Sequence, residues 1–313
     1  MAVSDEDIQR IAVLNPGDAG RRWLCRVRGL PGPWVAEDRV EAFWDAGDWE
    51  VFRARRARFG ALRSPFVVDV VDVESTSVTL ERWVTGAALM ATARAPLDPK
   101  AAVRIGSQVA TGLALIHQAG LRCQWLSPWD IVLSPLGVAR VTAVAKAPIP
   151  ARQGLVHREL DAPPGNPAWV SPEVLRSGHA VPASDVFALG AILYLTLAGE
   201  APFAADTAIA QMMRTLSEEP APLTQPGVPG PVNRLVLDML SKEPAARPTA
   251  RRVADTLAAE CGGAVPVGLG STVSDALEQL RSAVGAGDFA LVAALLELRP
   301  ELTREPTVRA YVV

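Results

Sequence analysis

Only a few side chains in this sequence have the types and spacing that catalysis or metal binding would need. The three cysteines, Cys25, Cys123 and Cys261, lie about a hundred or more residues apart, with no Cys-x-x-Cys pair and no histidine spaced to complete a zinc site. The chain has three lysines, and the first of them is Lys100. Before that position, any positive charge for an anionic ligand has to come from arginine.

The composition narrows the classes of function. The net charge is −3 and the isoelectric point is about 5.7, so there is no basic field to hold nucleic acid or an anionic membrane surface. The N-terminus is acidic where a signal peptide would be basic, and the longest uncharged apolar run, residues 186–199, is shorter than the ~18 residues of a membrane span. We therefore expect a cytoplasmic protein, with no nucleic acid and no membrane as a partner of this fragment.

Hydrophobic periodicity divides the chain into two unlike parts. Residues 10–85 alternate β-branched and polar residues between Gly and Pro breaks, which predicts strands, interrupted by one helix over residues 48–63. Further along, the pattern predicts an amphipathic helix over residues 101–117, capped by Asp98. A helix over residues 186–198 is apolar on nearly all faces, which places it at the centre of a domain.

The end of the sequence has a different character. Residues 262–271 are rich in Gly and apolar residues, which is typical of a linker. Two further helices are predicted beyond it around a Gly-Asp turn, and they resemble a helical-repeat hairpin of the tetratricopeptide kind. One such hairpin cannot bury its own apolar face, so we expect the chain to be a piece of a longer protein.

Three motifs stand in order in the second part of the chain, over residues 165–173, 185–190 and 242–248. Gly165-Asn-Pro-Ala-Trp-Val-Ser-Pro-Glu173 is similar to the end of the activation segment in the protein kinase family. Asp185-Val-Phe-Ala-Leu-Gly190, which begins twelve residues later, is similar to the start of the family's central helix. Lys242-Glu-Pro-Ala-Ala-Arg247-Pro248 resembles the family's closing Arg-Pro motif. The resemblance implies that Glu173 and Arg247 form a buried ion pair that braces this lobe, and that Asp185 is structural.

The first part of the chain resembles a kinase less closely. Residues 62–68 resemble the entry to the fourth kinase strand, and residues 80–86 resemble the hinge between the lobes. The resemblance covers roughly residues 10–260 and implies an α+β, bilobal protein-kinase-like fold. The domains expected from it are an N-lobe, a helical C-lobe, a linker and a helical hairpin, over residues 1–86, 87–261, 262–271 and 272–313 respectively.

Phosphoryl transfer in this family requires metal ions on the phosphates, a lysine that positions them and a carboxylate that orients the acceptor hydroxyl. According to the resemblance, the catalytic His-Arg-Asp triplet falls on Cys123, Gln124 and Trp125, and the catalytic-loop lysine falls on Ser127. The indole of Trp125 has no lone pair that could accept the acceptor's proton. The resemblance therefore implies that the catalytic base and its neighbours are replaced.

The residues that would bind metal and phosphate in this family are replaced in the same way. Asp130 stands at the position of a metal-binding Asn, where it is either a metal ligand or, as we favour, a cap of its own loop. Because no lysine precedes Lys100, the phosphate-anchoring lysine of the third strand is absent. We therefore expect no cofactor and no metal, since the Asp-Phe-Gly motif is also replaced, by Ala143, Val144 and Ala145.

Two tryptophans and an arginine cluster are candidates for partner binding. Trp125 is either an aromatic anchor for a partner or, as we favour, a plug that fills the cleft between the lobes. The same two roles remain open for Trp129. Arg53 and Arg56 belong to an arginine-rich helix, which is either a docking surface for an acidic partner or an ordinary charged helix face.

Together these features predict a bacterial pseudokinase that binds one or more proteins, not identified by the sequence, as a scaffold or allosteric regulator. This interpretation predicts a protein without phosphoryl transfer, and so not an enzyme. One alternative is an inactive switch that still binds nucleotide. Another is an enzyme with altered nucleotide-transfer chemistry on the same fold, in which arginine would replace the missing lysine.

Overall fold

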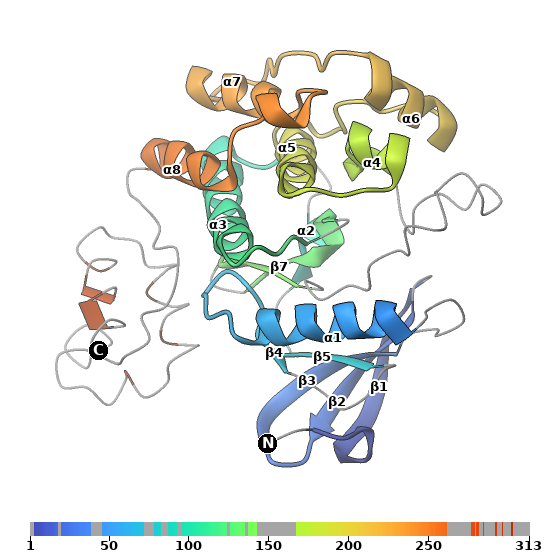
Figure 1. Cartoon of the computed structure of the whole chain (residues 1–313). Coiled ribbons are helices and arrows are strands. Elements are labelled where there is room, and N and C mark those ends of the chain that lie inside the picture. Colours follow the sequence, from blue (N-terminus) through green and yellow to red (C-terminus); the bar gives the residue numbers. More distant parts are fainter. Residues whose placement is uncertain are drawn as a thin grey trace.

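The chain folds into a strand-rich lobe and a helical lobe. In Figure 1 the strand-rich lobe is at the bottom and the helical lobe is at the top. The α+β, bilobal fold predicted from the sequence is therefore confirmed. The computed structural model describes residues 3–17, 20–38, 46–71, 78–82, 87–92, 96–123, 126–134, 137–142 and 167–261, and the single residues 277, 278, 280, 281, 284, 292, 296 and 302.

The strand-rich lobe contains a five-stranded antiparallel sheet with the order β1-β2-β3-β5-β4. A tight turn joins β2 to β3, and it contains Gly29 with a φ of 79°, which glycine adopts without steric cost. Alternate residues of these strands, such as Cys25, Val27 and Trp34, are buried in a small core. The strands are β1 (Ile8–Gly17), β2 (Gly20–Val27), β3 (Leu30–Asp38), β4 (Val70–Val71) and β5 (Val78–Arg82), preceded by the short turn η1 (Asp5–Asp7).

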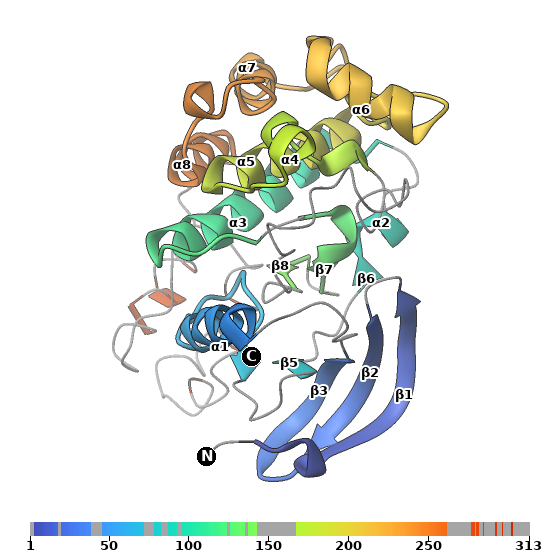
Figure 2. The same cartoon turned by 45° about the vertical axis from the view of Figure 1, so that its right-hand side comes forward.

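Helix α1 (Ala46–Gly60) lies between this sheet and the helical lobe, as Figures 1 and 2 both show. Phe52 and Phe59 on this helix are buried, and Phe59 belongs to the large core of the helical lobe. Residues 66–68, which follow the helix, pair with Val141 through hydrogen bonds of 2.9 Å in both directions. The helix and the segment after it therefore join the two lobes.

The helical lobe is organised around α5, whose residues are buried on nearly every side. Helix α3 packs closely beside α5 at Gly106. A Cβ atom at this position would lie only 2.5 Å from a methyl group of Leu193, so the contact requires glycine. The Asp98 side chain accepts a hydrogen bond from the Ala101 amide and caps α3, as the sequence predicts. The helices are α2 (Leu89–Thr92), α3 (Pro99–Gln118), α4 (Pro172–Ser177), α5 (Pro182–Ala198), α6 (Ala208–Ser217), α7 (Gly230–Met239) and α8 (Ala250–Glu260).

A second, three-stranded sheet with the order β6-β7-β8 lies at the base of the helical lobe. Its strands are β6 (Ala87–Ala88), β7 (Ile131–Leu133) and β8 (Ala139–Val141). Short 3₁₀ turns connect the larger elements, namely η2 (Pro128–Asp130), η3 (Pro167–Trp169) and η4 (Pro244–Ala246). The turn η2 contains Trp129 and Asp130, two of the candidate residues, and strand β7 follows it directly.

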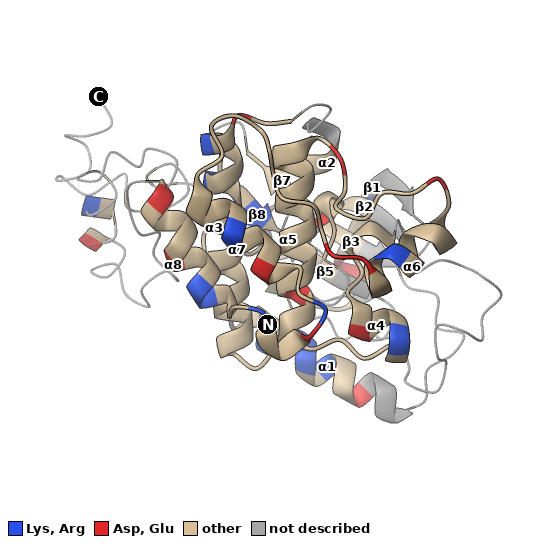
Figure 3. Cartoon of the chain, turned by 90° about the horizontal axis from the view of Figure 1, so that it is seen from above, with Lys and Arg blue, Asp and Glu red and all other residues tan. Residues whose placement is uncertain are grey.

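Part of the predicted organisation lies outside the described residues. The linker, residues 262–271, falls there entirely, and only isolated residues of the hairpin, residues 272–313, are described. The domain boundaries therefore remain predictions. Among the described helices, none is both long enough and apolar enough to cross a bilayer. Seen from above, basic and acidic residues are interspersed over the described helices (Figure 3).

Candidate functional site

The candidate site is the loop that leads from the end of α3 to β7. Asp185, in the first turn of α5, is 1% exposed and holds the start of this loop. Its Oδ2 atom accepts a hydrogen bond of 2.8 Å from the Cys123 amide and lies 2.9 Å from His117 Nε2. A buried carboxylate with two such partners fixes the backbone at Cys123 to the central helix.

Asp130 holds the far end of the same loop. Its Oδ2 atom accepts hydrogen bonds from the amide and the hydroxyl of Ser127, at 2.9 and 2.8 Å. The Asp130 carbonyl accepts a further hydrogen bond of 2.7 Å from the Thr142 amide. Asp130 is itself buried, so its carboxylate closes the turn η2 from within.

Trp129 projects from this turn into solvent. Its side chain is 58% exposed, whereas Trp34 and Trp169 are buried. Gln124 and Trp125 lie outside the described residues, and so do Ala143, Val144 and Ala145. The prediction that Trp125 plugs the cleft therefore stays a prediction. What the structure adds is that Trp129 stands on a turn that is fixed at both ends.

Glu173 and Arg247, far apart in sequence, meet at the start of α5. The guanidinium binds the carboxylate through two hydrogen bonds of 2.7 and 2.8 Å. Its remaining N–H groups donate to the carbonyls of Ala183, Ser241 and Lys242. All five donors of Arg247 are thus used, and its side chain is fully buried.

Ser184 is a member of this cluster that the sequence analysis missed. Its hydroxyl donates a hydrogen bond of 2.6 Å to Glu173. The available signal was its place directly before Asp185 at the start of α5, where a polar side chain is in reach of neighbouring elements. Burial raises the pKa of Glu173, but the hydrogen bonds from Arg247 and Ser184 together outweigh burial and hold that pKa at about 2.

The low pKa of Glu173 predicts a loss of stability in acid. Because the native pKa is below the unfolded value of 4.5, the carboxylate stabilises the fold above about pH 4.5, and this contribution is lost as the pH falls towards about 2. The difference in free energy of unfolding between the wild type and Glu173→Gln should therefore shrink over this window. Urea titrations at several pH values would measure it, and a constant difference down to pH 2 would contradict the prediction.

Two aromatic rings extend the cluster around Glu173 and Arg247 towards α6. Phe187 and Phe203 are stacked, with centroids 6.2 Å apart. Arg247 lies over the first ring, at 4.9 Å, and Lys242 over the second, at 3.8 Å. Burial lowers the pKa of Lys242 to about 8, against the attraction of the nearby Glu219 and Glu218 carboxylates, which raises it. These contacts give Lys242 a structural place beside this cluster.

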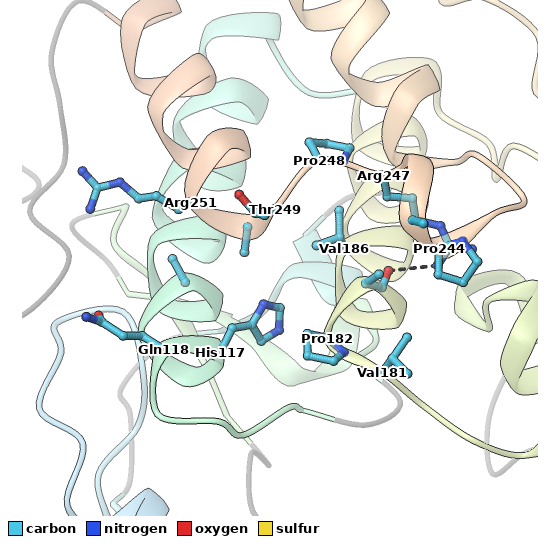
Figure 4. Close-up of a pocket in the computed structure, with 14 residues that line it drawn as sticks. His117, Gln118, Val181, Pro182, Val186, Pro244, Arg247, Pro248, Thr249 and Arg251 are labelled. Atoms are coloured by element: carbon cyan, nitrogen blue, oxygen red, sulfur yellow. Dashed lines mark hydrogen bonds between the residues drawn. The ribbon is translucent and has the colours of Figure 1, made fainter.

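A cavity of about 760 Å³ lies next to this cluster, between the end of α3, the start of α5 and the N-terminal part of α8 (Figure 4). Its walls include His117 and Arg247, along with several prolines and alanines. His117 is bonded to Asp185, and every donor of Arg247 has a protein partner. His117 Nε2 and the guanidinium of Arg247 are therefore already used by protein partners and are not free to anchor a ligand in this cavity.

The arginine-rich helix α1 differs from the expected surface at one residue. Arg56 is 1% exposed, and its guanidinium carbon lies 5.6 Å from the centroid of the Phe52 ring. The prediction that Arg56 belongs to a partner surface is therefore wrong. An arginine can bury its long apolar stem and stack its planar head on a ring, so a run of arginines need not be a solvated face. Arg53 is exposed, as a partner surface requires.

The kinase resemblance implies ATP with magnesium, and the described residues fit these ligands poorly. The Asp130 Oδ2 atom is already bonded twice by Ser127. Within the described part of the chain, no group of three or more His, Cys, Asp or Glu residues is placed to hold a metal ion. Magnesium needs several oxygen ligands in octahedral geometry, and the described residues bring no such set together.

Comparison with known proteins gives the family. A model described as the protein kinase domain matches residues 59–257, which is more than half of the chain. The serine/threonine-protein kinase PrkC of Bacillus subtilis is 28% identical over 248 residues, which cover 72% of this chain and 38% of that protein. The serine/threonine-protein kinase pkn3 of Myxococcus xanthus is 34% identical over 170 residues, which cover 49% of this chain and 30% of that protein. The serine/threonine-protein kinase drp72 of Corynebacterium efficiens is 27% identical over 271 residues, which cover 78% of this chain and 50% of that protein. The chain thus spans half or less of the length of these relatives.

These comparisons correct one prediction. The chain was expected not to be an enzyme, but the matched family is the protein kinase domain and the relatives are named serine/threonine-protein kinases, which points to an enzyme. The expectation rests on single positions such as Cys123 and Ser127, whereas the family match runs from the end of α1 into α8. The chain belongs to the protein kinase family.

Proposed function

We propose that this protein works in serine/threonine kinase signalling by binding another protein at the surface around Trp129, as a scaffold or allosteric regulator of it. The observation that carries this proposal is the exposure of Trp129. Tryptophan side chains are highly buried on average, and tryptophan is among the residues that contribute most to binding at protein interfaces. The names of the relatives support the signalling context.

The surroundings of Trp129 favour tight binding. The turn η2 is closed by the Asp130–Ser127 hydrogen bonds, and the chain before it is attached to α5 through Cys123 and Asp185. A side chain presented on a fixed turn loses little conformational freedom when a partner covers it. Trp129 is therefore held ready for binding, which a side chain on a loose loop would not be.

Removing the indole should weaken partner binding by roughly 2 kcal/mol, or about 30-fold, while leaving the melting temperature unchanged. The test uses the full chain, immobilised, to capture proteins from the native bacterium, followed by affinity measurement with each captured protein. Trp129→Ala is compared with Met213→Ala, which removes a side chain of similar exposure, 59%, from α6.

The comparison separates specific from general effects. Loss of affinity in Trp129→Ala alone would support the proposal, and equal affinity of both variants would contradict it. The same captured protein, incubated with ATP and magnesium, shows whether it is also a phosphate acceptor, which is the activity that the relatives' names imply. Binding and phosphate transfer are thereby measured on one pair of proteins.

A further inference from the structure

Two arginines of α1 reach out of the strand-rich lobe and end on the backbone of the helical lobe. The Arg55 Nη2 atom donates a hydrogen bond of 2.5 Å to the Arg122 carbonyl, and the Cys123 carbonyl lies 3.5 Å from the same atom. One turn later along the helix, Arg58 Nη2 donates to the Ala119 carbonyl. The acceptors are 61 to 68 residues away in sequence, so these are contacts between lobes.

The Ala119 carbonyl, which accepts from Arg58, suits an arginine for a physical reason. Ala119 is the C-cap of α3, and the last carbonyls of a helix have no partner within the helix. The helix dipole also makes this end negative, which favours a cation there. The guanidinium is a rigid fork that carries several donors, so it can satisfy such carbonyls from a neighbouring element.

Gly120 leaves room for the Arg58 side chain. A Cβ atom at this position would lie 2.8 Å from Arg58 Nη2, which is closer than real contacts allow. Gly120 also has a φ of +66°, which side chains other than glycine rarely adopt. The sequence at the end of α3 is thus suited both to the turn and to the incoming guanidinium.

The same short segment is also attached to the central helix. Cys123 donates its amide to Asp185 and offers its carbonyl to Arg55, so one residue links α1 to α5. The loop that carries Trp129 begins directly after this point. A shift of α1 would therefore change the support of that loop.

We propose that Arg55 and Arg58 form a latch, which fixes α1 against the C-terminal end of α3 and couples the position of α1 to the loop that carries Trp129. Arg53 is exposed on the same helix, as Arg58 is, and it serves as the matched comparison. The latch goes beyond the proposed partner binding, because it concerns how the two lobes are held and does not depend on what covers Trp129.

Hydrogen exchange of the full chain, measured by mass spectrometry, tests the latch. In the double variant Arg55→Met, Arg58→Met, the amides of residues 50–60 and 119–123 should exchange at least about tenfold faster, because two charge-assisted hydrogen bonds are lost. The strands β1 to β3 should exchange as in the wild type. The protein should remain folded, because residues 66–68 stay paired with Val141.

Two further variants keep the test decisive. Arg53→Met makes the same chemical change on the exposed position and should leave the exchange of both segments unaltered. If the double variant does not fold, Arg55→Lys with Arg58→Lys keeps the charge but removes the fork, and it should show the same direction of change. Unchanged exchange in the latch variants, or an equal increase in Arg53→Met, would overturn the proposal.

Discussion

Replacing Glu173 with alanine should lower the free energy of unfolding by roughly 3 kcal/mol or more. The fully buried Arg247 would lose two of its hydrogen bonds and its counter-charge, while its other donors stay fixed to carbonyls. A buried guanidinium without its carboxylate is costly, because its charge has been removed from bulk water and no counter-charge remains beside it. Urea denaturation at pH 7, followed by circular dichroism, measures the change.

A surface ion pair in the same lobe provides the control. Arg251 and Asp255 are also bonded at 2.9 Å, but their side chains are 62% and 57% exposed. Asp255→Ala should therefore change the free energy of unfolding by no more than about 0.5 kcal/mol. If both alanine variants destabilise the protein equally, the burial of Arg247 does not have the effect that we assign to it.

The helical lobe could be predicted from the sequence because its motifs are dense in special residues. The spacing from Glu173 to Asp185 to Arg247 falls on the ends of helices and on turns, where a single residue type is needed, and the family resemblance supplied the pairing. The Asp98 cap has a local signal of the same kind. Such signals depend on a few neighbouring residues and therefore remain visible in one sequence.

Contacts between distant elements left no comparable signal. Arg56 did carry a local signal, because it stands four residues after Phe52 and three before Phe59 and so shares their buried helix face, whereas Arg53 does not. The carbonyl acceptors of Arg55 and Arg58, by contrast, are invisible, since every residue has a carbonyl and only the packing of α1 beside α3 selects these.

The class of protein was misjudged for a related reason. Single replacements such as Ser127 were weighed one at a time, whereas the family match reflects the whole course of the chain from α1 to α8. The contacts within this loop do not depend on whether the protein is an enzyme. Asp130 accepts hydrogen bonds from Ser127, and the Cys123 amide donates to Asp185. Trp129, which lies between Cys123 and Asp130 in the sequence, is exposed.

The attachment of this loop leads to the last prediction, on Asp185. Asp185→Ala should lower the free energy of unfolding by roughly 2 to 3 kcal/mol, because the buried Cys123 amide loses its acceptor and His117 loses its partner. Asp185→Asn should cost less, about 1 kcal/mol, since the amide oxygen can still accept from Cys123.

A second measurement distinguishes local release of the loop from general weakening of the fold. In Asp185→Ala, hydrogen exchange at residues 119–123 should increase more than exchange in the middle of α5, because the loop loses its attachment while the apolar contacts of α5 remain. His117→Ala removes only one of the two contacts and should have an intermediate effect. A free energy of unfolding within about 0.5 kcal/mol of the wild type in Asp185→Ala would show that Asp185 does not anchor the loop that presents Trp129.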